Sequence, residues 1–425
     1  MSRKFFPFFR VMLRRGCHRF TGLPKFLFPE SYNKPCDFNI NNLPYGCFTT
    51  GHEAIPRIGV AIGDKVLDLT ALAKKGELHS SLSDTTLNKF ISQGKDVWAT
   101  TRTLIRQLLS DDSSHSLAFR PGFQEYFVAQ SDCQMHLPVN IGDYTDFYAS
   151  ESHATNVGRM FRGNENALMP NWKSLPVGYH GRSSSVVVSG TPIKRPHGQV
   201  RRGDETIFTA TTELDFELEL ACILGPGNSL GTPIEISRAE DHMFGFVLMN
   251  DWSARDIQRW EYQPLGPFLG KNFGTTISPW IVPLAALEPF RVALPAQNPK
   301  PLPYLASSTH TGYDLDLTVE INGSVVTKSN AKFLYWSFPQ QVAHHTINGC
   351  NIRAGDLIGS GTISGEEISS FGSMLELNWN KTRKIAVGTE SRTFLDDGDF
   401  VKISGSTIRG ENRIGFGDCT GLVLP

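Results

Sequence analysis

The strongest chemical signal in this 425-residue sequence is a stretch of alternating acids and apolar residues. From position 213 to position 220 every odd residue is Glu or Asp, and every even residue is Leu or Phe. This period of two predicts a half-buried β-strand with its acids along one face. Unpaired carboxylates about 7 Å apart repel each other and raise each other's pKa. We therefore expect a positive group over the row, and a divalent cation with oxygen ligands is favoured over a solvated surface.

A second segment, residues 143–153, places three acids, two phenols and one imidazole close together. A carboxylate such as Asp146 suits a hard cation, and a histidine that does not bind the metal could act as a general base near neutral pH. A lone histidine is more often structural than catalytic. The neighbours of His153 make the catalytic and the structural interpretations equally favoured.

Two later segments could complete a site. Asp251 follows an apolar run at 244–248, so it stands at a strand end, where binding residues often gather. Asp251, Arg255 and Gln258 would share a face if the turn is helical, although Asp251 could instead cap a surface helix. Lys271 lies in a loop flanked by glycines and could stabilise a developing negative charge, or it could be a solvated lysine.

Three other motifs are disfavoured. Residues 227–231 fit the Gly-x-Ser-x-Gly pattern, but Thr-Pro follows at once, so the helix that a serine nucleophile needs is missing. The glycines at 359–365 do not fit dinucleotide binding, although their backbone amides could bind an anion. His344 and His345 would point about 100° apart on a helix, which favours core or capping roles over metal binding.

Composition favours an intracellular protein with a small-molecule partner. The 42 acids nearly cancel the 41 bases, which argues against nucleic-acid binding, and no apolar run reaches the roughly 20 residues that span a membrane. The seven cysteines are odd in number and form no Cys-x-x-Cys pair, so reduced thiols are expected. The first acid is Glu30, and the preceding 29 residues are rich in Arg and Phe. We expect a cytoplasmic protein, or a mitochondrial one if residues 1–29 act as a presequence.

The elements that must position these residues fall into two domains after a basic extension at 1–36. The sequence pattern over 37–138 predicts a small barrel or sheet. It also predicts two helices over 87–109, with a break between them near Gly94. Residues 139–425 predict a large antiparallel or mixed β domain with helical pattern mainly at 237–243 and 331–345. Its expected strands lie at 184–189, 214–224, 244–250, 280–283, 315–321, 356–359, 374–379 and 400–404.

Several uncommon strings occur in one order along most of the chain. Together they resemble the fumarylacetoacetase family closely, from about Asp37 to Pro425, and only the first 36 residues depart from the family pattern. The strings lie at 141–148, 153–158, 164–172, 175–182, 249–258, 361–365 and 371–376.

The resemblance implies a mainly β fold, with an N-terminal SH3-like barrel domain and a C-terminal mixed β-sandwich or β-roll domain that forms a homodimer. It also implies a Ca²⁺ or Mg²⁺ ion in each active site. The family hydrolyses the carbon–carbon bond of 4-fumarylacetoacetate to fumarate and acetoacetate, the final step of tyrosine and phenylalanine breakdown.

The resemblance also assigns roles to matching positions. His153 matches the general base and Glu376 the acid that orients it. Oxyanion stabilisation falls to Arg255, Gln258 and Lys271. The substrate contacts are Tyr148, Arg162, Tyr179, Gln258, Tyr262 and Thr362. The metal positions are Asp146, Glu217, Glu219 and Asp251, with Lys271 and Thr275 at positions associated with magnesium.

Under these assignments Glu213 and Asp215 are not ligands, and we expect them to be solvated or paired. Three alternatives to the family's activity are a serine esterase, a non-catalytic metal-binding β module, and a decarboxylase or acylpyruvate hydrolase of the wider superfamily. Sensitivity to chelators and the choice of substrate distinguish them.

Overall fold

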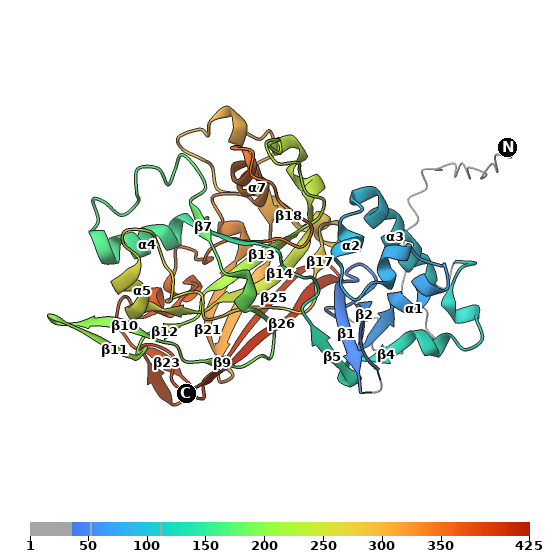
Figure 1. Ribbon diagram of the computed structural model, residues 1–425, viewed down its shortest axis with the longest axis horizontal. Coiled ribbons are helices and arrows are strands. Elements are labelled where there is room, and N and C mark those ends of the chain that lie inside the picture. Colours follow the sequence, from blue (N-terminus) through green and yellow to red (C-terminus); the bar gives the residue numbers. More distant parts are fainter. Residues whose placement is uncertain (1–35, 52, 111–112) are drawn as a thin grey trace.

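A small N-terminal domain lies beside a larger C-terminal domain in the computed structural model, which describes residues 36–51, 53–110 and 113–425 (Figure 1). Over the described residues as a whole, strands outnumber helices, so the predicted mainly β fold class is confirmed. Apart from Cys36, the basic extension lies outside the described residues. Within the described part, no helix is both long and apolar enough to cross a membrane.

The N-terminal domain is built on an antiparallel sheet with strand order β4-β3-β2-β1-β5. Gly94 separates its last two helices with a φ of 85°, a left-handed conformation that ends one helix and precedes the next, so the predicted break is confirmed. The elements are β1 (Tyr45–Thr50), β2 (Glu53–Ile62), β3 (Lys65–Asp68), α1 (Leu69–Lys74), α2 (Asn88–Ile91), α3 (Lys95–Leu108), β4 (Phe127–Ala129) and β5 (Cys133–His136).

A central sheet of the C-terminal domain has the order β7-β6-β22-β13-β14-β16-β8, with β17 paired to β14. Its two middle strands are almost continuously apolar, as expected of strands that are covered on both faces. The strands are β6 (Tyr144–Phe147), β7 (Gly178–His180), β8 (Val186–Val188), β13 (Leu218–Leu224), β14 (Met243–Asp251), β16 (Thr275–Ile277), β17 (Val282–Pro283) and β22 (Leu357–Gly359).

The two faces of this sheet belong to different cores. Leu220 and Leu248 pack into the core of the C-terminal domain. Ala221 and Val247 face the other way and join the cluster that contains Phe90 of the N-terminal domain. The two domains therefore share one core across the central sheet.

A second sheet, with the order β21-β20-β25-β26-β9, forms the other layer of the C-terminal domain, and short strand pairs and helices fill the rest. Its strands are β9 (Ile193–Lys194), β20 (Asp316–Ile321), β21 (Ser324–Asn330), β25 (Phe400–Arg409) and β26 (Asn412–Leu424). The pairs are β10 (His197–Arg202) with β11 (Glu205–Ala210), β12 (Leu214–Asp215) with β15 (Ser253–Ala254), β18 (Arg291–Ala293) with β19 (Thr311–Tyr313), and β23 (Ile385–Val387) with β24 (Glu390–Arg392). The helices are α4 (Glu151–Arg162), α5 (Arg255–Glu261), α6 (Leu284–Leu287), α7 (Phe338–Thr346) and α8 (Met374–Leu377).

Four local predictions need correction. The strand expected over 214–224 is interrupted at Phe216 and Glu217. The strand expected at 374–379 is the helix α8, and the helix expected over 331–345 is split into a short 3₁₀ turn (Ala331–Phe333) and α7, which begins beside Pro339. The helix expected at 237–243 is a 3₁₀ helix (Ile236–His242). Helix α4 was not predicted at all.

Candidate active site

Four carboxylates from separate segments meet at one end of the central sheet. Asp146 lies in β6, Glu219 in β13 and Asp251 at the end of β14, while Glu217 stands in the interruption before β13. One oxygen from each of them lies within 4.8 Å of the others. The structure thus brings together the four side chains that the family resemblance assigned to the metal.

All four acids of the alternating stretch are buried, with at most 5% of each residue exposed, so the predicted half-buried strand is wrong. Basic side chains from distant segments pair with three of them, Glu213, Asp215 and Glu217. Arg255 pairs with Asp215 and Glu217. Glu213 pairs with two further basic side chains, Arg259 and Lys381. Glu213 and Asp215 are therefore paired and not solvated.

Lys271 is buried beside the cluster and donates to Glu217 and to Asp251, the latter at 2.5 Å. Its interpretation as a solvated loop residue is therefore wrong. Burial alone would lower the pKa of Lys271, but the two carboxylates raise it above its ordinary value. A protonated ammonium group has no lone pair, so the side chain acts here through its charge and hydrogen bonds.

The charges within the cluster are unevenly neutralised. Burial would raise the pKa of Glu217, but Lys271 and Arg255 together lower it to about 2. Burial and the neighbouring carboxylates raise the pKa of Asp146 and of Glu219 well above their usual range. One half of the cluster is therefore held by protein cations, while the other half has no such partner.

The residues present fit a hard divalent cation. Asp146 Oδ1 and Glu219 Oε1 are buried and have no hydrogen-bond partner in the described part of the protein. A Cβ atom added at Gly359 would lie 2.7 Å from that Asp146 oxygen, so the missing side chain keeps space beside it. The donors are all oxygens, which Ca²⁺ and Mg²⁺ prefer.

His153 lies in the first turn of α4, where the Ser150 hydroxyl caps the helix and accepts from the His153 backbone N–H. The ring is buried, and its Nδ1 lies 2.6 Å from Glu376 Oε2 on α8. Burial would raise the pKa of Glu376, but His153 and hydrogen-bond donors lower it. A carboxylate in this position fixes the ring and stabilises its protonated form.

Helix α8 owes its position to the acidic strand. The Asp215 carboxylate accepts from the backbone N–H groups of Met374 and Leu375 at 2.7 and 3.0 Å, which places an anion at the start of this short helix. Ser373 caps the same helix by accepting from Glu376 N. Asp215 is thus an anchor for the helix that presents Glu376.

A cavity of about 410 Å³ opens over the histidine and the cluster. The lining includes every side chain that was predicted to contact substrate, together with Asp146, His153, Glu217, Glu219, Arg255 and Lys271. Glu376 lies behind His153, and Asp251 and Thr275 face an adjoining cavity of about 160 Å³. Among the predicted substrate contacts, the Tyr179 hydroxyl already donates to Asp251 at 3.1 Å.

Arg255 lines this cavity and has one guanidinium nitrogen that the described residues leave without a partner. Its Nε and Nη1 bind Asp215 and Glu217 at 2.8 Å, while Nη2 is buried and has no partner among the described residues. Asp251 is not the cap of this helix, because α5 begins after Ala254, so that alternative is wrong. A buried N–H donor that lacks a partner suits a developing oxyanion.

Several residues of the site were missed at the sequence level. Asn156 and Ser364 donate to Glu376 at 3.0 and 2.9 Å. The backbone N–H of Gly361 donates to the Glu219 carboxylate at 3.0 Å. The glycine segment at 359–365 therefore does bind an anion through a backbone amide, and that anion is a side chain of the protein itself. The spacing of Asn156 three residues after His153 on α4 was an available signal, but the contacts of Ser364 and Gly361 depend on tertiary pairing.

Two of the disfavoured motifs, residues 227–231 and the adjacent histidines, do not line this cavity. Ser229 lies in a loop that no α-helix follows. His344 contacts the Tyr304 hydroxyl at 3.0 Å, and His345 contacts the Thr145 hydroxyl at 2.9 Å, so both have structural partners.

Comparison with known proteins agrees with this geometry. The family model described as fumarylacetoacetate (FAA) hydrolase C-terminal matches residues 143–423, and the model described as fumarylacetoacetase N-terminal matches residues 41–138. A fumarylacetoacetase from Rattus norvegicus is 54% identical over 404 residues, which cover 92% of this chain and 96% of that protein. One from Arabidopsis thaliana is 50% identical over 407 residues, with 91% and 96% covered.

A solved fumarylacetoacetate hydrolase from Exiguobacterium antarcticum supports the fold. It superposes with a TM-score of 0.53 at 19% identity and covers 90% of this chain and 99% of its own. The family models together span most of the sequence, and the relatives match nearly their whole length. The chain therefore belongs to the fumarylacetoacetase family of hydrolases.

Proposed function

We propose that the protein hydrolyses the carbon–carbon bond of 4-fumarylacetoacetate to fumarate and acetoacetate, with a divalent cation in the carboxylate cluster and His153 as general base. The observation that carries the proposal is the placement of the His153–Glu376 pair on the same cavity as the four carboxylates. The names of the relatives support the choice of substrate.

His153 is placed to activate water. Its Nδ1 faces Glu376, which leaves Nε2 as the nitrogen that can take a proton on the cavity side. The water oxygen then bonds to the carbonyl carbon next to the fumaryl arm. Glu376 stabilises the imidazolium that forms, as a buried carboxylate does in other hydrolytic sites.

Arg255 and Gln258 are placed to stabilise the tetrahedral oxyanion. Among the described residues Arg255 Nη2 has no partner, and Arg255 Nη1 donates to Gln258 Oε1 at 3.3 Å, which leaves the Gln258 amide N–H groups for the substrate. Lys271 contributes positive charge at the base of the same cavity. The carbon–carbon bond then breaks, acetoacetate leaves as its enolate, and the imidazolium of His153 returns the proton.

The cation would be held by Asp146, Glu217, Glu219 and Asp251, with Ca²⁺ or Mg²⁺ as the proposed ion. When bound there, it supplies Lewis acidity and a template for the 1,3-dicarbonyl group of the substrate.

The decisive experiment follows the ultraviolet absorbance of fumarylacetoacetate with purified protein, before and after treatment with EDTA. We expect turnover that EDTA abolishes and that Ca²⁺ or Mg²⁺ restores. Turnover that survives EDTA but fails with a serine-directed acylating reagent would indicate an esterase. Faster turnover of acylpyruvates than of fumarylacetoacetate would contradict the proposed substrate.

His153→Ala tests the proposed base. Loss of a general base should lower kcat by about 10²- to 10⁴-fold, whereas the bound cation should stay, because His153 is not a proposed ligand. His344→Ala, a histidine outside the cavity, is the matched control. Near-normal turnover by His153→Ala would overturn the assignment.

We further propose a cytoplasmic homodimer. Residues 1–29, which would support import into mitochondria, lie outside the described residues. N-terminal sequencing of the native protein tests the location of the mature start, and light scattering tests the dimer.

A further inference from the structure

A separate cavity of about 430 Å³ lies where the two domains meet. One face of α3, carrying Lys95, Trp98 and Arg102, forms its N-terminal side, and the start of β14 with α6 forms the other side. It shares no lining residue with the cavity over His153. Its volume falls within the roughly 300 to 1,000 Å³ typical of small-molecule pockets.

The floor of this interdomain cavity is aromatic. The Trp98 and Tyr45 rings each pack edge-on against Phe244, with centroid distances of 5.1 and 5.4 Å. Phe90 supports the Tyr45 and Phe244 rings from below, at 5.6 and 5.9 Å. Rings held on several sides provide a preformed apolar surface for a flat or aliphatic ligand.

Arg102 is a buried cation on this cavity without a counter-ion. Only 9% of the residue is exposed, and it donates to the carbonyls of Asn41 and Asn42, the latter at 2.7 Å. No acid pairs with it in the described part of the chain. Burial lowers its pKa to about 10, so it stays protonated at neutral pH. The nearby Tyr45 hydroxyl also has no hydrogen-bond partner among the described residues.

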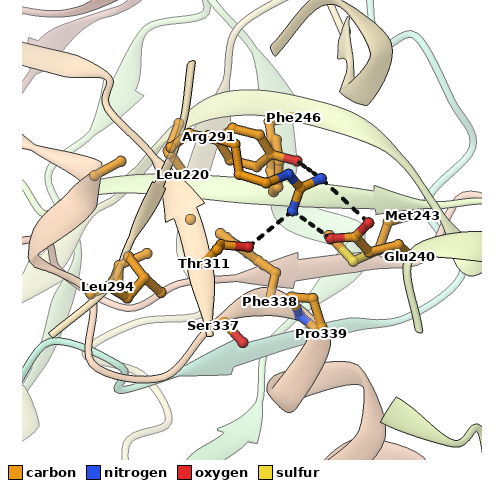
Figure 2. Close-up of a pocket in the computed structure, with 14 residues that line it drawn as sticks. Leu220, Glu240, Met243, Phe246, Arg291, Leu294, Thr311, Ser337, Phe338 and Pro339 are labelled. Atoms are coloured by element: carbon orange, nitrogen blue, oxygen red, sulfur yellow. Dashed lines mark hydrogen bonds and ion pairs between the residues drawn. The ribbon is translucent and has the colours of Figure 1, made fainter. Parts of the chain in front are cut away.

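The other charged groups of the lining are already paired. Lys95 lies against Asp241 at one edge. Arg291 binds Glu240 and Glu288 at the opposite edge, and Figure 2 shows it reaching between Glu240 and Thr311 from the neighbouring side. The hollow drawn in Figure 2 is only about 20 Å³, which suits a water molecule or two. Within the described residues, Arg102 is thus the lining charge that has no counter-ion.

We propose that the interdomain cavity binds a small carboxylate with an aromatic or aliphatic body. The carboxylate accepts from Arg102 and from the Tyr45 hydroxyl, and the body lies over Trp98 and Phe244. The site is independent of the proposed catalytic function. It lies at the opposite end of β14 from Asp251, about 23 Å away for seven residues of strand.

Isothermal titration of the full-length protein with 3-phenylpropanoate tests the site, with 3-phenylpropanamide as the neutral probe of the same shape. We expect one bound 3-phenylpropanoate per chain and affinity for the amide roughly 10- to 100-fold weaker, because the charge-assisted hydrogen bonds are lost. Equal affinities of the two probes would overturn the proposal.

Variants locate the binding. Ala99→Phe fills the cavity from an exposed helix position and should abolish binding, whereas Thr100→Phe, on the same helix but outside the lining, should leave it unchanged. Arg102→Gln should weaken binding roughly tenfold or more. Arg162→Ala, in the catalytic cavity, should retain it. Binding that survives Ala99→Phe and is lost in Arg162→Ala would place the probe in the catalytic cavity and overturn the inference.

Discussion

At the scale of single residues, the ionised state of Glu376 is set by its neighbours. Burial would raise its pKa, but His153, Asn156 and Ser364 lower it below its ordinary value of 4.5. A lowered pKa in the folded protein contributes stability that is present above the ordinary pKa and is lost as the pH falls through the folded value. The free energy of unfolding that Glu376 contributes is therefore lost as the solution becomes acidic.

Glu376→Gln should remove this contribution. We expect the difference in unfolding free energy between wild type and Glu376→Gln to shrink as the pH is lowered from about 6 to about 3, as measured by urea unfolding. Turnover should also fall, because a neutral amide cannot stabilise the imidazolium of His153. A stability difference that is constant over this range would show that the Glu376 charge has no net effect on folding.

The residue types of the site were predictable from local patterns, but their partners were not. The period of two at 213–219 identified an acidic row and the need for positive charge. Arg255, however, is 40 positions from Asp215, and Lys381 is 168 positions from Glu213. Glu213 and Asp215 pair with basic side chains that are distant in the sequence, so they act as structural anchors and not as metal ligands. No local sequence pattern predicts these pairings.

At the scale of elements, β22 passes directly between two of the cluster strands. Its residue Gly359 pairs with Asp146 on β6 and with Ala221 on β13. A Cβ atom at this position would lie 2.6 Å from Met249 Cε and 2.7 Å from Asp146 Oδ1. The absence of a side chain is therefore a requirement of the cluster.

Gly359→Ala should push the Asp146 carboxylate out of place. We expect at least a tenfold loss of cation affinity, from titration calorimetry, and a loss of about 1 to 3 kcal/mol of stability from overpacking. Gly51→Ala, where nothing lies within 4 Å, is the control and should change neither quantity. Unchanged cation affinity in Gly359→Ala would mean that the strands absorb the methyl group without moving Asp146.

Helix α8 shows why some elements resist prediction. Its short alternating run resembles a strand, and four residues are too few for helical periodicity to appear. The Ser373 cap was a local signal, but the Asp215 carboxylate that binds its first N–H groups lies 159 residues away. Longer elements such as α3, with Gly94 before it, were predictable because their signals are local and repeated.

At the scale of the whole molecule, we expect the shared core to make the two domains one folding unit. Phe90 of the N-terminal domain packs against Phe244 at the start of the central strand β14. Removing the N-terminal domain would expose one face of the sheet that carries the carboxylates. The C-terminal domain therefore depends on the N-terminal domain to cover this face of its central sheet.

Phe90→Ala tests this coupling. Loss of a fully buried phenylalanine should cost about 3 to 5 kcal/mol, and thermal unfolding followed by calorimetry should shift as one transition. Two separated transitions, with the catalytic domain melting at its original temperature, would show instead that the domains unfold independently.

The interrupted strand at 214–219 has a geometric consequence. Asp215 holds α8, the helix that carries Glu376, and Glu217, two residues later, belongs to the carboxylate cluster, while Arg255 pairs with both. The spacing between the residue that anchors α8 and the carboxylate cluster is therefore fixed by two residues of backbone, about 7 Å of extended chain. Surface loops can lengthen or drift without changing it, whereas inserting one residue between 215 and 217 would turn one of the two carboxylates away from its partner.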